Sequence, residues 1–110
     1  MKLPGGDRAV IEPAKIRDYL LSAAHPVGRF KAAFFASLGY DDEGWDRLRD
    51  DLLDVAAGDS AVPGGPSAYG TKYEVRASLT GPNGRSAEIV SVWIVLHAER
   101  VPRFVTAFPM

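Results

Sequence analysis

Midway along the chain, the spacing of apolar residues changes from the period of a helix to the period of a strand. Before Gly58 the apolar residues recur every three or four positions, as they do on one side of a helix. From Tyr73 to Leu79 they alternate with polar residues, as they do in a strand with one buried side. The sequence therefore predicts an α+β fold, with two or three N-terminal helices packed on a three- to four-stranded antiparallel sheet.

Three segments before this change are predicted to be helical. The first, residues 13–22, begins with a proline, which suits a first helical turn, and ends before His25 and Pro26 break it. The second spans residues 28–39 and ends at a glycine, and the third opens at Asp41 or Asp42 and ends at Gly58. Their expected core residues are Phe30, Phe34, Phe35 and Leu38 in the second helix and Trp45, Leu48, Leu52 and Val55 in the third.

Turn residues divide the rest of the chain into strands. Residues 58–70 contain four glycines and two prolines, which predicts a loop. Residues 81–84, Gly-Pro-Asn-Gly, predict the turn of a hairpin whose second strand, residues 87–96, is apolar on both sides and therefore central. Residues 101–108 supply a last strand, and residues 9–11 an edge strand or an extended lead-in.

The side of the central strand that meets the helices follows from its alternation. Ser91, Trp93 and His97 share one side of this strand. The other side is entirely apolar, and we expect the helices to pack on it. That side consists of Val90, Val92, Ile94 and Leu96.

Composition indicates one globular domain over residues 1–110. Hydrophobic residues make up 46% and charged residues 25%, and the formal net charge is -1, so an RNA site would have to be a local patch. The absence of cysteine excludes disulfides, thiolate metal sites and a cysteine nucleophile. No apolar run approaches the roughly 20 residues that cross a bilayer, and no apolar signal segment opens the chain. We therefore expect a cytoplasmic protein without membrane contact.

Sequence motifs give no support to a cofactor. The nucleotide-binding patterns GxxxxGK[ST] and GxGxxG, the zinc pattern HExxH and the EF-hand loop are all absent, as is the hydrolase pattern GxSxG. The two histidines, His25 and His97, have no further ligand at a familiar spacing. We expect neither a metal ion nor another cofactor.

The densest polar cluster is HPVGRFK, which carries His25, Arg29 and Lys31 at the start of a predicted helix. Free backbone N–H groups, two basic side chains and a group that titrates near neutral pH suit the binding and cleavage of a phosphodiester. The alternative is that His25 closes the bend before the proline while Arg29 and Lys31 are ordinary surface residues.

A second cluster lies on the predicted sheet. Trp93 is either a core residue or part of a binding surface. On the last strand, Arg103 and Thr106 point to opposite sides, so they share one site only if a bulge or the strand end intervenes.

The chain also resembles known bacterial domains. The segments LPGGDRAVIEPAKIRDYLL, HPVGRFKAAFFASLGY, LTGPNGRSAEIVSVWIV and VPRFVTAFP resemble a family of small uncharacterised bacterial domains of unknown function. The order of helices and sheet, with the terminal strand RFVTAFP, is similar to the superfamily of barnase, EndoU, colicin and RelE-type ribonucleases of bacterial toxins. That resemblance implies metal-independent RNA cleavage, in which a ribose 2′-hydroxyl attacks the adjacent phosphate.

Two hypotheses follow for the function. In the ribonuclease hypothesis RNA is the partner, and the catalytic residues are His25, Lys31 and Thr106. Arg29 or Arg103 would neutralise the phosphate, and either Tyr73 or Trp93 would stack on a base. The alternative is a non-catalytic protein-interaction module of a toxin–antitoxin-type or phage-related system. An acidic neutralising protein would be a partner in either case. The ribonuclease hypothesis requires the three catalytic residues to surround one cleft.

Overall fold

The computed structural model describes residues 1–110 and has the helices before the sheet, as predicted. The helical part consists of a short 3-10 helix η1 (Gly6–Arg8), α1 (Pro13–Lys15), the π-helical η2 (Ile16–Leu20), α2 (Arg29–Ser37) and α3 (Trp45–Ala56). The strands are β1 (Ala61–Pro66), β2 (Gly70–Thr80), β3 (Ser86–Leu96) and β4 (Arg103–Pro109). The predicted α+β class is confirmed.

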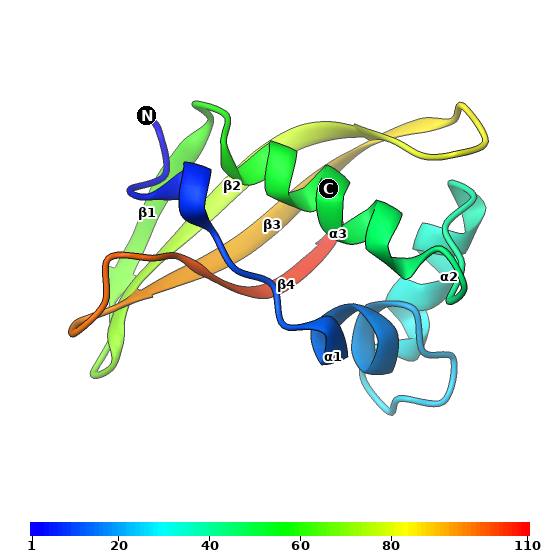
Figure 1. Ribbon diagram of the computed structural model, residues 1–110, viewed down its shortest axis with the longest axis horizontal. Coiled ribbons are helices and arrows are strands. Elements are labelled where there is room, and N and C mark those ends of the chain that lie inside the picture. The colour runs from blue at the N-terminus through cyan, green and yellow to red at the C-terminus, as the bar shows by residue number, and fades with distance from the viewer.

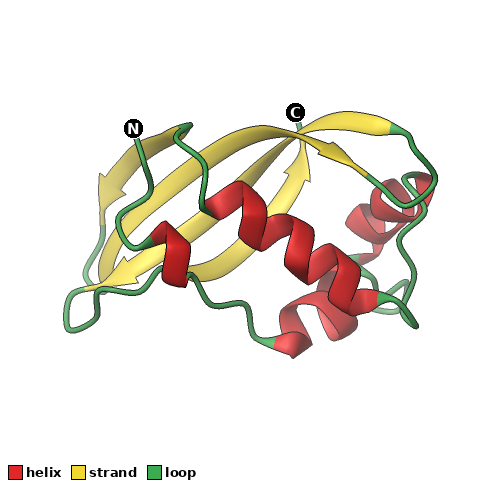
Figure 2. Cartoon of the chain, turned by 45° about the horizontal axis from the view of Figure 1, so that its top comes forward, coloured by secondary structure: helices red, strands yellow, loops and turns green.

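The four strands form one antiparallel sheet in the order β1-β2-β3-β4. Helix α3 runs along the sheet, while α1, η2 and α2 gather at one of its ends (Figure 1). The turned view shows the helices on one side of the curved sheet (Figure 2). The hairpin predicted at residues 81–84 is confirmed, and Gly84 has a φ of 84°, which a glycine adopts without strain.

The loop predicted over residues 58–70 is partly wrong, because Ala61–Pro66 forms the edge strand β1. Pro63 pairs with Tyr73, and the register shifts between Pro63 and Pro66. A proline donates no hydrogen bond to a sheet, but at an edge its nitrogen can face away from the neighbouring strand. The prolines are therefore compatible with an edge strand, which the prediction had excluded.

The side of β3 that faces the helices is the opposite of the predicted one. Ile89, Ser91 and Trp93 are fully buried, whereas Val92 and Ile94 on the other side are half-buried. The polar atoms of the buried side satisfy one another. The Trp93 indole N–H donates to Ser91 Oγ at 2.9 Å, and the Ser91 hydroxyl donates to the Val75 carbonyl at 3.1 Å. This network explains how a strand face with a serine can lie in the core.

The core residues predicted for α3 and α2 agree with the structure to different degrees. In α3, Leu48 and Leu52 are fully buried, as predicted. In α2, Phe35 lies in the core and Phe34 packs against it, but Phe30 is 72% exposed and does not belong to the core. The hydrophobic spacing of α2 is confirmed from its second turn onward.

The extended residues before α1 border the outer edge of β4. Val10 forms a parallel bridge with Arg103. Its N–H donates to the Pro102 carbonyl at 2.9 Å, and the Phe104 N–H donates to the Val10 carbonyl at 3.0 Å. The extended lead-in predicted over residues 9–11 is confirmed, and it delivers α1 and η2 to the same edge. None of the helices has both the length and the apolar character needed to cross a bilayer.

Candidate functional site

A single phenol hydroxyl, that of Tyr19, joins three elements of the fold. Tyr19 lies in η2, where the Leu21 N–H donates to the Ile16 carbonyl, five residues earlier, at 2.9 Å. The helix predicted over residues 13–22 therefore ends at Leu20 in a wide π-turn, a feature often found at functional sites. Ile16 and Leu20 are fully buried and fix this turn on the core, while Tyr19 is half-buried.

Helix α2 brings Lys31 to this hydroxyl. Lys31 Nζ donates to Tyr19 Oη at 2.9 Å and lies 5.2 Å from the centre of the phenol ring. The close approach depends on Gly28, because a Cβ atom at that position would lie 2.1 Å from the Tyr19 carbonyl oxygen. The glycine at the start of α2 thus sets the distance between the two helical segments.

Strand β4 brings Thr106 to the same hydroxyl from the far end of the chain. The Thr106 Oγ1 and Tyr19 Oη atoms are 3.0 Å apart. Thr106 pairs with Val92 and Phe104 with Trp93, so β4 has one extra residue and contains a bulge. From the sequence, Thr106 and Arg103 could lie on the same side of β4 only if the strand contained a bulge or ended between them. The structure contains such a bulge.

His25 borders the Tyr19 ring and holds the turn into α2. The two rings meet edge to face, with centres 5.0 Å apart. His25 Nδ1 accepts the N–H of Val27 at 3.0 Å and the N–H of Gly28 at 2.9 Å. The residue therefore closes the bend, as its structural interpretation anticipated. Because Nδ1 is an acceptor, the ring proton resides on Nε2, and that nitrogen is a donor.

Tyr19, His25 and Thr106 border a surface cavity of about 620 Å³, which we call the Tyr19 cavity, whereas Lys31 lies outside its lining and reaches only the Tyr19 hydroxyl. It is lined by Glu12, Ala14, Lys15, Asp18, Tyr19, His25, Val27, Val105 and Thr106. A second hollow, of about 450 Å³ between α3 and β2, is lined by Asp51, Asp54 and Asp59 with one cation, Arg76. The Tyr19 cavity has fewer carboxylates, those of Glu12 and Asp18, and contains Lys15. No three His, Cys, Asp or Glu side chains are grouped so as to hold a metal ion.

The charges around Tyr19 change its titration. Burial raises the pKa of its phenol, but the hydrogen bonds of Lys31 and Thr106 and the charges of Lys31 and Lys15 lower the pKa by more. The net pKa lies below the usual value of 10.0. A phenol whose anion is stabilised in this way, in an open cavity, is suited to proton transfer and to work beside a bound anion.

The structure brings Lys31, Thr106 and His25 together around Tyr19, but it leaves other predicted residues elsewhere. Trp93 is fully buried beside Phe104, with ring centres 5.3 Å apart. The prediction that its ring could stack on a base is therefore wrong. Tyr73 packs against the core and does not line the Tyr19 cavity.

The two arginines predicted to contact phosphate also lie outside this lining. Arg103 donates to both carboxylate oxygens of Glu99, at 2.8 and 3.0 Å, and Glu12 lies 3.9 Å away. Arg29 is exposed and its guanidinium stacks over Phe30 at 4.8 Å. Positive charge at the Tyr19 hydroxyl comes from lysines instead.

Sequence reasoning missed Tyr19 and Lys15. The spacing of Tyr19 with Ile16 and Leu20 fits an apolar helix stripe, which indicates a packing role rather than a site. The four-residue interval between Lys15 and Tyr19 is the available signal, and Lys15 Nζ indeed lies 5.8 Å from the ring centre.

Comparison with known proteins gives a structural relative and a family. No curated protein matches the chain. The fold is similar to a chain of the contact-dependent growth inhibition toxin - immunity protein complex from Klebsiella pneumoniae 342. The TM-score is 0.74 and the identity 19%, over 93% of this chain and 100% of that chain. The family model described as "Domain of unknown function (DUF6883)" matches residues 2–110. The predicted resemblance to a bacterial domain of unknown function is confirmed, and the chain belongs to the DUF6883 family.

Proposed function

We propose that the protein is a toxin-like ribonuclease that cleaves RNA without a metal ion, by attack of a ribose 2′-hydroxyl on the adjacent phosphate. The convergence of Lys31 and Thr106 on the Tyr19 hydroxyl, beside an open cavity, carries this proposal. Lys15, which lines the cavity, places a second ammonium group near the Tyr19 ring. Hydrogen-bond donors and positive charge at one point are what the transition state of phosphate displacement requires.

Three groups would bind the reacting phosphate. The Lys31 ammonium has three N–H bonds, and one of them goes to Tyr19, so others are available for a phosphate oxygen. The Thr106 hydroxyl would donate to a second oxygen, and His25 Nε2–H to a third. We assign His25 the role of a donor rather than of an acid or base, because its Nδ1 is already used by two backbone N–H groups.

A toxin system is the proposed setting of this activity. The similarity in fold to a chain of a toxin–immunity protein complex supports it. An acidic protein that covers Lys15 and Lys31 would neutralise the site, and it is the partner we propose.

A second candidate is a non-catalytic interaction module of such a system. The side of the sheet away from the helices carries half-buried apolar residues, including Val92, Ile94 and Phe108, which a protein partner could cover. This candidate predicts binding without RNA cleavage.

The test is incubation of the purified protein with single-stranded RNA in the presence of EDTA. We expect cleavage to fragments with a 2′,3′-cyclic phosphate and a 5′-hydroxyl, and no cleavage of DNA of the same sequence, which lacks the attacking hydroxyl. Lys31→Met should lower the rate by about 100-fold or more. The matched control is Lys72→Met, which removes an exposed lysine of β2 and should leave the rate unchanged.

Failure of the wild-type protein to cleave RNA under these conditions would contradict the ribonuclease proposal. Cleavage that requires a divalent metal would contradict the proposed mechanism. In the first case the interaction module becomes the better account.

A further inference from the structure

We propose, on the basis of the ribonuclease function above, that Tyr19 is the general base that removes the proton from the ribose 2′-hydroxyl. The residue lies at the centre of the cluster, since both Lys31 and Thr106 contact its oxygen. Its side chain also lines the Tyr19 cavity, where a nucleotide would reach it. The sequence points instead to His25, the catalytic candidate of a type that titrates near neutral pH.

The hydrogen bonds of the cluster favour the ionised phenol. Lys31 is a donor only, so its bond at 2.9 Å uses a lone pair of Tyr19 Oη. The 3.0 Å contact with Thr106 can run in either direction, since both groups are hydroxyls. When Tyr19 is neutral it can donate to Thr106, and when it is a phenolate Thr106 can donate to it. A phenolate would therefore be held by two donors in the free protein, and by the Lys31 ammonium once Thr106 turns its single proton to the bound phosphate.

The contacts of His25 argue against it as the base. A general base needs a free lone pair, and Nδ1 is committed to the N–H groups of Val27 and Gly28. Its other nitrogen, Nε2, carries the proton in this arrangement and cannot accept another. Lys15 and Lys31 lie near the ring, and the Lys31 ammonium already donates to Tyr19 Oη. The cavity lining also contains two carboxylates, Glu12 and Asp18, but neither forms a hydrogen bond with Tyr19 or its partners. Tyr19 is thus the group within the hydrogen-bonded cluster whose oxygen can gain a proton.

The proposed step balances as follows. The 2′-oxygen forms a bond to phosphorus while its proton passes to the Tyr19 phenolate oxygen. The bond from phosphorus to the 5′-oxygen of the next nucleotide breaks, and that oxygen takes a proton from a water molecule in the open cavity. The hydroxide left from the water removes the proton from Tyr19 and restores the phenolate. The net change is transesterification to a cyclic phosphate, without an oxidant, a reductant or a metal ion.

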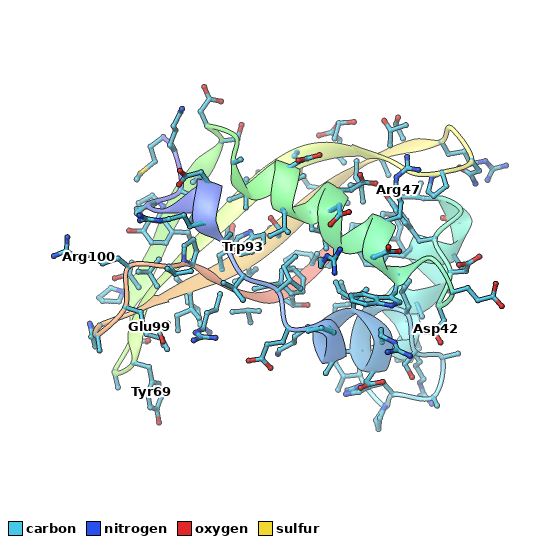
Figure 3. All side chains as sticks on the ribbon, viewed as in Figure 1. Asp42, Arg47, Tyr69, Trp93, Glu99 and Arg100 are labelled. Atoms are coloured by element: carbon cyan, nitrogen blue, oxygen red, sulfur yellow. The ribbon has the colours of Figure 1, made fainter.

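The test compares Tyr19→Phe, which removes only the hydroxyl, with a matched Tyr69→Phe control. Tyr69 is 76% exposed and lies at the end of the sheet opposite α1 (Figure 3). With single-stranded RNA and EDTA, we expect Tyr19→Phe to lower the rate by about 100-fold and Tyr69→Phe to leave it unchanged. Circular dichroism would establish that both variants are folded.

A second measurement does not depend on RNA cleavage. The ultraviolet absorbance of phenolate, followed as pH rises, should reveal one tyrosine in the wild-type protein that ionises below the ordinary range. We expect this early transition to disappear in Tyr19→Phe and to move to higher pH in Lys31→Met, because the stabilising ammonium is lost. Lys31→Arg should keep it low. The lower limb of the pH–rate profile should move in the same direction as the absorbance transition.

Each outcome decides between the two proposals. If the wild-type protein cleaves RNA and folded Tyr19→Phe cleaves it equally fast, Tyr19 is not the base and the ribonuclease function stands. An absorbance transition that is unaffected by Tyr19→Phe would also overturn the role of Tyr19. If the wild-type protein cleaves no RNA, the ribonuclease function fails, and the role of Tyr19 fails with it.

Discussion

At the residue scale, His25 combines a structural contact with a proposed functional one, and two substitutions separate them. In His25→Ala both are lost, and removal of the cap at the start of α2 should cost about 1 kcal/mol of stability. His25→Asn retains an acceptor near the position of Nδ1 but has no equivalent of Nε2, so its loss of stability should be smaller. Both variants should cleave RNA more slowly. Urea denaturation and an RNA cleavage assay measure the two effects.

The two variants together test the assignment. Equal stability of His25→Ala and His25→Asn would show that the Nδ1 contacts do not hold the turn. Unchanged cleavage by both would remove His25 from the proposed site.

Tyr40 ties stability to alkaline pH. The residue is 3% exposed, and its hydroxyl donates to Asp51 Oδ2 at 2.6 Å. Burial raises the pKa of Tyr40 above its ordinary value of 10.0, and the hydrogen bond and charge of Asp51 act in the same direction. The folded protein therefore holds this proton more tightly than the unfolded chain does. The resulting stability is complete below about pH 10 and is lost as pH rises above it.

We expect the melting temperature of the wild-type protein to fall above about pH 10, and to fall less steeply in Tyr40→Phe. Tyr19, with its lowered pKa, opposes this trend by adding stability as pH rises toward 10.0. Comparison of the two proteins over the same pH range isolates Tyr40. Parallel curves for the two proteins would show that Tyr40 contributes no pH dependence.

At the element scale, β3 determines which side of the sheet meets the helices. Ile89 is fully buried on the helical side, and Ile94 is half-buried on the other. Ile89→Ala should therefore cost about 2 to 5 kcal/mol, and Ile94→Ala clearly less. Equilibrium denaturation of the two variants makes the comparison. A larger loss for Ile94→Ala would mean that the helices pack on the other side.

The same strand shows how far the sequence predicts this fold. Residues that alternate or interrupt a period, such as those of β2 and the turn at residues 81–84, predict their elements well, because period and turn chemistry are local. Which side of β3 is buried cannot be read from the strand itself, because it has apolar residues on both sides. The buried side depends on how Trp93 packs beneath the helices, which are distant in the sequence. The strand β1 could not be predicted because its prolines argue against a strand. They are compatible with one only at the edge of a sheet, and the position of β1 at the edge is not visible in the sequence.

In the candidate site, too, the features that depend on local sequence could be predicted and those that depend on distant contacts could not. The chemistry of HPVGRFK indicated His25 and Lys31, and the resemblance to toxin ribonucleases indicated Thr106 on the terminal strand. The tyrosine that joins two of them could not be recognised, because its contacts depend on a π-turn and on a bulge in β4. Neither irregularity has a periodic signal, and both move a side chain by changing the residue count of a turn or strand.

At the scale of the whole molecule, charge is distributed locally although the total is nearly neutral. Lys15 and Lys31 flank Tyr19, whereas the hollow between α3 and β2 is acidic. Glu12 and Asp18 line the same cavity as Lys15, so the positive charge is concentrated at the Tyr19 hydroxyl rather than spread over the cavity. In the proposed function, the two lysines would therefore favour the orientation of an RNA backbone that places a phosphate beside this hydroxyl, despite a formal net charge of -1.

The contact between Tyr19 and Thr106 spans 87 positions of a chain of 110 residues. A contact between residues so far apart in the sequence forms slowly and late in folding, because nearly the whole chain must be ordered before the two hydroxyls can meet. A partly folded chain that has its helices but lacks β4 would not contain the site at all. The site therefore forms only together with the complete sheet, and a chain that is still unfolded would lack the proposed activity.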